Sequence, residues 1–242
     1  MSEEEIRERV LRRYSVAQNP VGLWRLNLYV RWKRCSWRCF VAGTALLKRA
    51  FDMVASFILL IVLLPLLAVV ALLVKLEDGG PVFFAQTRVG RWGCEFKMLK
   101  FRSMSPGAEE QLPSLLARNE HREGVAFKIK NDPRITKAGR WMRRYSLDEL
   151  PQLWNVLRGE MSLVGPRPPW PREVAHYTPA DRRRLTITPG ITCLWQVGGR
   201  SEIDFSGQVK LDVLYIESQS FWGDVRILLR TVPAVLSGRG AS

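Results

Sequence analysis

Residues 50–74 read AFDMVASFILLIVLLPLLAVVALLV, an apolar stretch that contains one charged residue, Asp52, and is interrupted by Pro65. A helix of this length would extend about 37 Å at ~1.5 Å per residue, whereas the hydrocarbon core of a bilayer is about 30 Å thick. The stretch is therefore long enough to cross a membrane as a single helix, which is the simplest interpretation.

A re-entrant hairpin is the second topology open to this stretch. Lys48 and Arg49 precede it, Lys75 follows it, and both flanking segments are rich in Lys and Arg, as is typical of cytoplasmic loops. Pro65 lacks an amide hydrogen and clashes with the preceding turn, which predicts a kink. We therefore expect the chain to return to the face it entered, with Asp52 near the headgroups and paired with Lys48 or Arg49.

The overall composition indicates a basic protein with a folded core. Its 242 residues are 47% hydrophobic and include 37 Lys or Arg and 23 Asp or Glu, a net charge of +14. Such a charge favours polyanions: nucleic acid, anionic lipid or a diphosphate substrate. No zinc site is predicted, because the few cysteines and histidines lack metal-binding spacing; they are Cys35, Cys39, Cys94, Cys193, His121 and His176.

Three parts are predicted along the chain: a basic, Trp-containing extension at 1–47, the membrane hairpin at 48–76 and a compact α/β, mostly helical domain at 77–242. Short strands are expected at 81–84 and 96–101. The extension suits a membrane surface, a solvated helix or a disordered lead-in. A final helix carries an apolar stripe that suits core packing or a membrane interface, formed by Phe221, Val225, Leu228, Leu229, Val232 and Leu236.

Residues 143–171, RRYSLDELPQLWNVLRGEMSLVGPRPPWP, are the densest in residues able to do chemistry. Ser146 and Glu149 have the spacing of a capping box, and Asp148 would sit in the first turn of the helix. That geometry alone explains the pattern structurally. It would equally hold an ionised carboxylate beside Arg143 or Arg144, where it could attack a phosphorus atom.

Cations must accompany such an attack, because the incoming diphosphate is itself negative. Oxygen ligands from Asp148 and Glu149 without histidine favour Mg²⁺, bridged to substrate phosphate. Lys100 and Arg102 could add positive charge, although each of them also suits a protein surface.

Two proline and glycine turns frame further candidates. In GPRPP, residues 165–169, the neighbours Pro166 and Pro168 fix the backbone around Arg167, which would present its guanidinium to phosphate. A second turn at 188–190 precedes ITCLWQVGGR, which offers Gln196 and Arg200 as nucleotide contacts. The sequence contains no P-loop, no GxGxxG after a strand and no Ser/His/Asp set.

Several of these motifs together resemble the polyprenyl-phosphate hexose-1-phosphate transferases, or monotopic phosphoglycosyl transferases. The resemblance covers residues 48–242. It runs in order through KRAFD (48–52), LKFRSM (99–104), DPRIT (132–136), SLDELPQLWNVLRGEMSLVGPRP (146–168), PGITCLWQVGGR (189–200) and VLSGRGA (235–241). The family uses an adjacent Asp-Glu pair as its catalytic dyad, which here is Asp148-Glu149.

The resemblance implies a ping-pong transfer of sugar 1-phosphate from a UDP-sugar to undecaprenyl phosphate. Asp148 would form an aspartyl phosphosugar as UMP leaves, and Glu149 would position Mg²⁺ or assist proton transfer. Lys100 and Arg143 would contact phosphates and Arg167 the diphosphate. The implied setting is the cytoplasmic face of the bacterial inner membrane, ahead of downstream glycosyltransferases in exopolysaccharide, capsule, O-antigen or glycoprotein glycan synthesis, with anionic lipids and a homodimer as further expected partners.

Two departures and several alternatives accompany the resemblance. Many members have Ser before the hairpin proline, whereas this chain has Leu64, and 1–47 hold no segment long enough for the membrane bundle of larger relatives. The sugar stays open among galactose, glucose and N-acetylated sugars. A non-catalytic membrane scaffold in glycan assembly is the alternative function. A nucleic-acid partner is not expected, since no binding motif accompanies the charge.

Overall fold

The computed structural model describes residues 4–5, 7–8, 20–108, 110, 132–199 and 203–237. The chain divides into two units, residues 1–48 and 49–242. In the first unit, residues 20–48 are helical, and Trp24, Trp32 and Trp37 are exposed. Of the alternatives for the extension, the described residues 20–47 adopt a helix.

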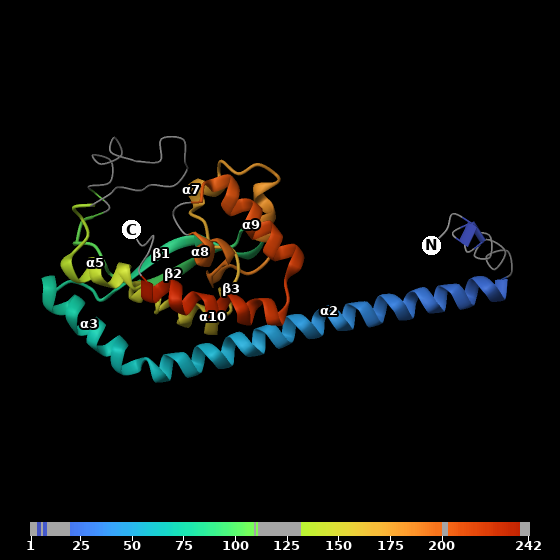
Figure 1. Cartoon of the computed structure of the whole chain (residues 1–242), viewed down its shortest axis with the longest axis horizontal. Coiled ribbons are helices and arrows are strands. Elements are labelled where there is room, and N and C mark those ends of the chain that lie inside the picture. The colour runs from blue at the N-terminus through green and yellow to red at the C-terminus, as the bar shows by residue number, and fades with distance from the viewer. Residues whose placement is uncertain are drawn as a thin grey trace. The chain divides into compact units, whose positions relative to one another are not determined.

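The described residues are mostly helical with four short strands, which confirms the α/β, mostly helical fold class (Figure 1). The helices are α2 (Pro20–Val62), α3 (Leu64–Asp78), α5 (Lys137–Arg144), α6 (Gln152–Arg158), α7 (Pro171–Val174), α8 (Leu194–Gly198), α9 (Phe205–Ser218) and α10 (Phe221–Ser237). Three 3-10 helices are η1 (Arg91–Gly93), η3 (Leu147–Glu149) and η4 (Asp181–Thr186). The strands are β1 (Phe83–Val89), β2 (Glu95–Phe101), β3 (Ser162–Val164) and β4 (Gly190–Thr192).

The apolar stretch is broken at the proline, as predicted. α2 ends at Val62, α3 begins at Leu64, and the two helices meet at a bend of 63°. Pro65 lies in the first turn of α3, where its missing amide hydrogen costs least. Among the described residues no single helix is long and apolar enough to cross a membrane, although α2 and α3 meet that test as a bent pair.

Two small sheets carry the strands. β1 and β2 form an antiparallel hairpin in which Phe84 faces Lys100, so the first strand begins later and runs further than the predicted 81–84. β3 and β4 pair in parallel. Just after β3, a Cβ on Gly165 would lie 2.6 Å from the Thr188 carbonyl oxygen, so only glycine permits this close approach.

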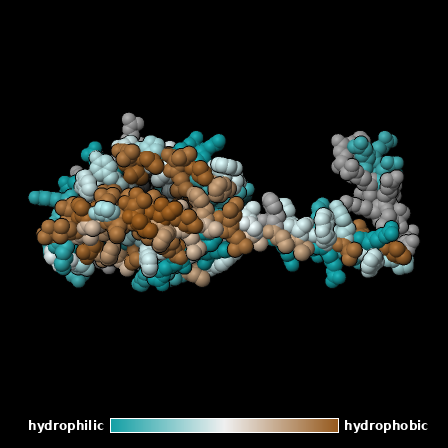
Figure 2. Space-filling view, turned by 90° about the horizontal axis from the view of Figure 1, so that it is seen from below, coloured by the Kyte–Doolittle hydropathy of each residue, from teal (hydrophilic) through white to brown (hydrophobic). Residues whose placement is uncertain are grey.

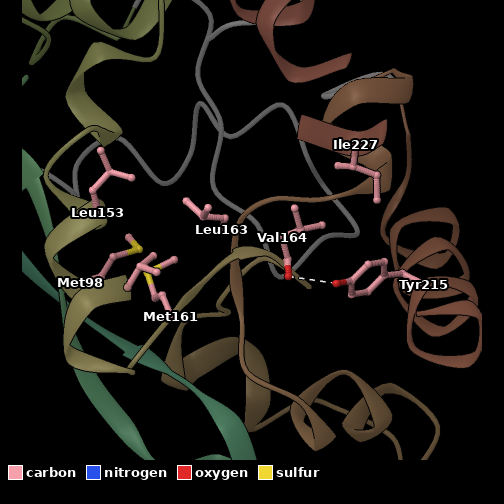
Figure 3. Packing of buried hydrophobic residues seen from close by; sticks show 8 residues of the cluster. Met98, Leu153, Met161, Leu163, Val164, Tyr215 and Ile227 are labelled. Carbon is pink, nitrogen blue, oxygen red and sulfur yellow. Dashed lines mark hydrogen bonds between the residues drawn. The ribbon is translucent and has the colours of Figure 1, made fainter. Parts of the chain in front are cut away.

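The main core joins β2, α6, β3, α9 and α10 (Figure 3). It contains Met98, Leu153, Val156, Met161, Leu163, Val164, Tyr215 and Ile227. A smaller cluster packs α3 against β2 and α5 through Val70, Val74, Phe101 and Met142. α3, the second helix of the bent pair, thus packs against β2, the strand that carries Lys100.

The bent pair exposes a broad apolar face (Figure 2). Its exposed side chains include Val54, Phe57, Ile58, Ile61, Val62, Leu64, Val69, Leu72, Leu73 and Leu76. Patches of this extent mark protein or membrane contacts. α10 adds Trp222, Leu229, Val232 and Leu236, all exposed. Of the predicted α10 stripe, Phe221, Leu229, Val232 and Leu236 are exposed, whereas Leu228 packs against the core. Core packing therefore accounts for only part of the stripe.

Asp52 is buried against the rest of the domain, and its expected position near the lipid headgroups stays a prediction. Only 3% of it is exposed. Its carboxylate accepts hydrogen bonds from Ser162 Oγ at 2.7 Å and from the Leu163 amide at 3.2 Å. These partners are distant in sequence, so local spacing could not reveal them.

Candidate active site

Lys100 and Glu149 form an ion pair at the centre of the candidate site. The Lys100 Nζ atom lies 2.7 Å from Glu149 Oε1, and both side chains are mostly shielded from solvent. Lys100 belongs to β2 and Glu149 to η3, so the contact joins the hairpin to the turn that carries the dyad. An ion pair shielded in this way is screened little by salt.

The turn carrying the dyad differs from the predicted helix start. Ser146 adopts a left-handed conformation, φ 54°, and its side chain caps no amide. Asp148 and Glu149 lie in the 3-10 turn η3, and the α-helix that follows, α6, begins only at Gln152. The capping-box prediction is therefore wrong. The Glu149 carboxylate does not cap this turn; it accepts a hydrogen bond from Lys100 of β2.

Asp148 is the buried member of the dyad, with 7% exposed. Burial raises its pKa and Glu149 adds to that effect, while Lys100 and Arg143 oppose it without cancelling it. Of the groups expected to keep Asp148 ionised, Arg143 does lower its pKa, and an ionised Asp148 stays a prediction. Arg144, another of those groups, is exposed and lies over the Tyr145 ring.

The pKa of Glu149 is shifted in the opposite direction to that of Asp148. Burial alone would raise its pKa, but Lys100, Arg167 and Arg88 outweigh that effect and lower the pKa to about 2. The two adjacent carboxylates therefore differ in acidity, because the cations act more strongly on Glu149. Such separation is typical of paired carboxylates with distinct roles.

Arg143 reaches the site from the last turn of α5. Its Nε donates to Ser103 Oγ at 2.9 Å, and its charge acts on Asp148 and Glu149. α5 approaches closely because residue 139 is glycine: a Cβ there would overlap the Ser103 carbonyl oxygen. The predicted neighbourhood of Lys100, Arg143 and the dyad is thus present in the structure.

Arg167 follows β3 in a loop whose residues Pro166 and Pro168 are buried. Its guanidinium charge acts on Glu149, and within the described residues no side chain or carbonyl is hydrogen-bonded to it. An arginine of this kind has its planar fork available for a phosphate.

Arg88 is a site residue that the sequence did not reveal. It is 3% exposed, donates to the Pro168 carbonyl at 3.0 Å and to Gln86 Oε1, and lies 4.3 Å from the Trp170 ring centre. Burial and the charge of Arg167 lower its pKa to about 9. Its only sequence signal is a cation within a β strand, which is too common to single it out.

The two nucleotide-contact candidates fare differently. Gln196 lies in α8, half-buried, and its Oε1 accepts from the Cys193 thiol at 3.2 Å. No hydrogen bond or ion pair joins it to the dyad within the residues that the structure covers. Arg200 lies outside the described residues. Both remain predictions.

A metal site must be judged on the carboxylates alone. Among the described residues there is no cluster of three or more His, Cys, Asp or Glu side chains. Asp148 and Glu149 nevertheless offer adjacent oxygens, and the raised pKa of Asp148 indicates a carboxyl that lacks sufficient positive charge. Two carboxylates completed by substrate phosphates are a usual ligand set for Mg²⁺, so the residues fit this ion.

Comparison with known sequences identifies the family. A family model described as "Bacterial sugar transferase" matches residues 43–238. The chain belongs to the bacterial sugar transferase family. The resemblance inferred from the motifs is thereby confirmed, and this sugar transferase can be set beside its relatives.

Three relatives illustrate the likeness. The galactosyl transferase CpsE of Streptococcus agalactiae is 52% identical over 166 residues, covering 68% of this chain and 37% of its own length. The undecaprenyl-phosphate galactose phosphotransferase of Salmonella typhimurium is 45% identical over 198 residues, 81% of this chain and 41% of its own. The exopolysaccharide production protein ExoY of Rhizobium meliloti is 42% identical over 197 residues, covering 80% of this chain and 87% of its own.

This sugar transferase therefore spans less than half the length of the first two relatives and most of the third. The shared part contains the candidate site, because the family match at 43–238 includes the strand with Lys100, the dyad and the Arg167 loop.

Proposed function

We propose that this transferase moves a sugar 1-phosphate from a UDP-sugar to undecaprenyl phosphate and releases UMP, as the first membrane-linked step of exopolysaccharide or related glycan synthesis. The observation that carries the proposal is the buried Asp148 beside Glu149, surrounded by Lys100, Arg143 and Arg167. The relatives support it, since several are named as undecaprenyl-phosphate sugar phosphotransferases.

In the first half-reaction an ionised Asp148 oxygen attacks the phosphorus that bears the sugar. The new Asp–O–P bond forms as the bond from that phosphorus to the bridging oxygen breaks, and UMP leaves with the electron pair. Arg167 and Lys100 stabilise the negative charge on the diphosphate oxygens and on the leaving group. The partly desolvated site strengthens these interactions, because less water competes for the same oxygens.

In the second half-reaction a phosphate oxygen of undecaprenyl phosphate attacks the same phosphorus. The Asp–O–P bond breaks, the Asp148 carboxylate is regenerated, and the product is a polyprenyl diphosphate sugar. Glu149 is paired with Lys100, and nearby cations lower its pKa to about 2, so we assign it a role in holding cations.

Asp148 and Glu149, together with the diphosphate, would hold Mg²⁺. When bound, this ion would supply charge neutralisation at the phosphates and favour the ionised form of Asp148. The residues of the chain supply the rest: Arg143 and Lys100 keep the dyad within a positive field, and the proline-bounded loop orients Arg167.

We further infer that the chain is monotopic, with the α2–α3 hairpin entering and leaving the cytoplasmic face of the inner membrane. The exposed apolar face of the hairpin and the outward stripe of α10 support this topology (Figure 2), as does the bend at Pro65. An exposed Trp222 near Arg226 suits the lipid headgroup region. Labelling single cysteines placed before and after the hairpin tests it, since opposite-side labelling would refute re-entry.

The activity is tested by measuring UMP release from a panel of UDP-sugars, with undecaprenyl phosphate and Mg²⁺ present and absent. We expect one sugar to support turnover in the presence of the lipid and a single round of UMP release without it. UMP release from none of the sugars, by folded protein in bilayers, would favour the scaffold alternative.

A further inference from the structure

The first helix of the bent pair, α2, is tied to two segments of the candidate site by charged side chains at the beginning of its apolar stretch. Arg49 donates to the carbonyl oxygens of Val156 at 2.5 Å and Leu157 at 2.8 Å, near the C-terminus of α6, the helix that follows the dyad. Asp52 accepts from Ser162 and Leu163 in β3, the strand that leads into the Arg167 loop. A cation at a helix C-terminus and a buried carboxylate on a strand amide are both stabilising contacts.

The second helix, α3, is tied to the other two segments at its end. Glu77 accepts from the backbone amides of Lys137 at 2.7 Å and Ala138 at 3.3 Å, the start of the helix α5 that carries Arg143. Asp78 forms a two-pronged ion pair with Arg102, which follows the strand carrying Lys100.

A buried hydrogen-bond network extends the first tie across the domain. The Tyr215 hydroxyl group of α9 donates either to the Val164 carbonyl oxygen at 3.0 Å or to Asp224 Oδ1 at 2.8 Å (Figure 3). β3 thus contacts Asp52 of α2 through Ser162 and Leu163, and Tyr215 of α9 through Val164. All of these side chains are buried.

We propose that Arg49, Asp52, Glu77 and Asp78 are positioning residues of the transferase reaction, through which the bent membrane helix pair sets the relative placement of the dyad and its cations. Each binds a different segment: α6 after the dyad, β3 before Arg167, α5 with Arg143, and the end of β2 beyond Lys100. None of the four touches the dyad itself in the described structure. The inference rests on the proposed function.

The ties matter because group transfer is sensitive to small displacements. Misplacing reacting groups by about 1 Å costs on the order of 100-fold in rate. Lys100, Arg143 and Arg167 reach the dyad from three separate segments. These segments also contact one another, and the helix pair adds a further tie to each of them. Loosening one tie therefore lowers the rate of the chemical step more than it lowers the affinity for UDP-sugar.

The test compares Asp52→Asn and Asp78→Asn with the wild-type full chain in bilayer nanodiscs. The control is Glu217→Gln. Glu217 lies on α9, outside the helix pair, and the substitution removes its exposed ion pair with Arg183. The probe is the UDP-sugar that gives most UMP release, with undecaprenyl phosphate as acceptor. The readouts are kcat, KM for UDP-sugar, and Tm.

We expect both variants to lose about 10-fold or more in kcat with KM changed by less than about 2-fold, at temperatures well below Tm. Ser162→Ala removes the hydroxyl group that donates to Asp52. It should reproduce the loss if Asp52→Asn does not fold. Variant kcat values equal to that of Glu217→Gln would overturn this inference alone. A wild type that releases no UMP would reject the proposed function and this inference with it.

Discussion

Lys100 Nζ lies 2.7 Å from Glu149 Oε1, and this contact fixes which carboxylate of the dyad is the more acidic. The lysine lowers the pKa of both dyad members, but it donates its hydrogen bond to Glu149. Asp148, the proposed nucleophile, lacks that bond, and burial raises its pKa.

Lys100→Met should lower kcat by about 100-fold, because it removes a cation aimed at the dyad and the substrate phosphates. It should also move the acidic limb of the pH–rate profile to higher pH, since Lys100 lowers both carboxyl pKa values. Lys97→Met is the matched control: it lies on the same strand, is exposed and binds Thr87. Equal losses in both variants would contradict the assignment.

Acidification should inactivate the enzyme at a pH above the ordinary aspartate pKa. Burial raises the pKa of Asp148 above 3.8, and attack requires its carboxylate form. Glu149 stays ionised in this range because its pKa is about 2. The rate of UMP release in a single turnover, measured from about pH 8 down to pH 4, should fall as Asp148 becomes protonated. A rate that stays constant down to the ordinary aspartate pKa would be inconsistent with a buried nucleophile.

Asp148→Asn should abolish transfer while keeping or raising Tm at neutral pH. A raised folded-state pKa means that the folded protein binds more protons than the unfolded chain, so stability falls as pH rises through it. Because asparagine does not ionise, the variant does not lose this stability as pH rises. Thermal melts at neutral pH and near pH 4 should show the advantage of the variant shrinking on acidification. A large drop in Tm would instead indicate that the carboxylate supports the fold.

Arg88→Gln should raise KM for UDP-sugar by about 10-fold, because Arg88 holds the Pro168 carbonyl and thereby the loop that presents Arg167. Steady-state kinetics over a range of UDP-sugar concentrations measures this change. Arg172→Gln serves as the control, since Arg172 lies 4.6 Å from the centre of the same Trp170 ring but is exposed. Unchanged KM in Arg88→Gln would remove Arg88 from the site.

Gly139→Ala should destabilise the protein by about 1–3 kcal/mol. Its Cβ would overlap the Ser103 carbonyl oxygen, so α5 must move away from β2. A methyl group on the helical Gly43 would meet no atom within 4 Å, so Gly43→Ala should be neutral or mildly stabilising. Chemical denaturation of both variants distinguishes a specific clash from a general effect of alanine.

The features that the sequence predicted well are those set by local chemistry. Pro65 breaks the helix because it has no amide hydrogen to donate, whatever surrounds it. Lys100 lies on a strand because its neighbours are apolar and aromatic. The prolines around Arg167 restrict the backbone by themselves. These properties need no knowledge of distant partners, so the bend, the strand and the loop all follow from spacing.

The features that the sequence missed depend on contacts between distant segments. Ser146 has the local pattern of a cap, but the left-handed turn it adopts directs Glu149 toward Lys100. The partners expected for Asp52 were neighbours on its own helix, whereas in the structure it also binds Ser162 and Leu163. Arg88 is buried by the loop that follows β3. None of these pairings leaves a periodic or spaced signal in the chain.

The most direct test of the central claim is the intact mass of the protein after incubation with the accepted UDP-sugar and Mg²⁺ in the absence of lipid acceptor. We expect a mass increase of one phosphosugar, mapped to Asp148, lost when undecaprenyl phosphate is added, and absent in Asp148→Asn. Turnover of both substrates by a protein that carries no such adduct on Asp148, in samples quenched during the first catalytic cycle, would contradict the account.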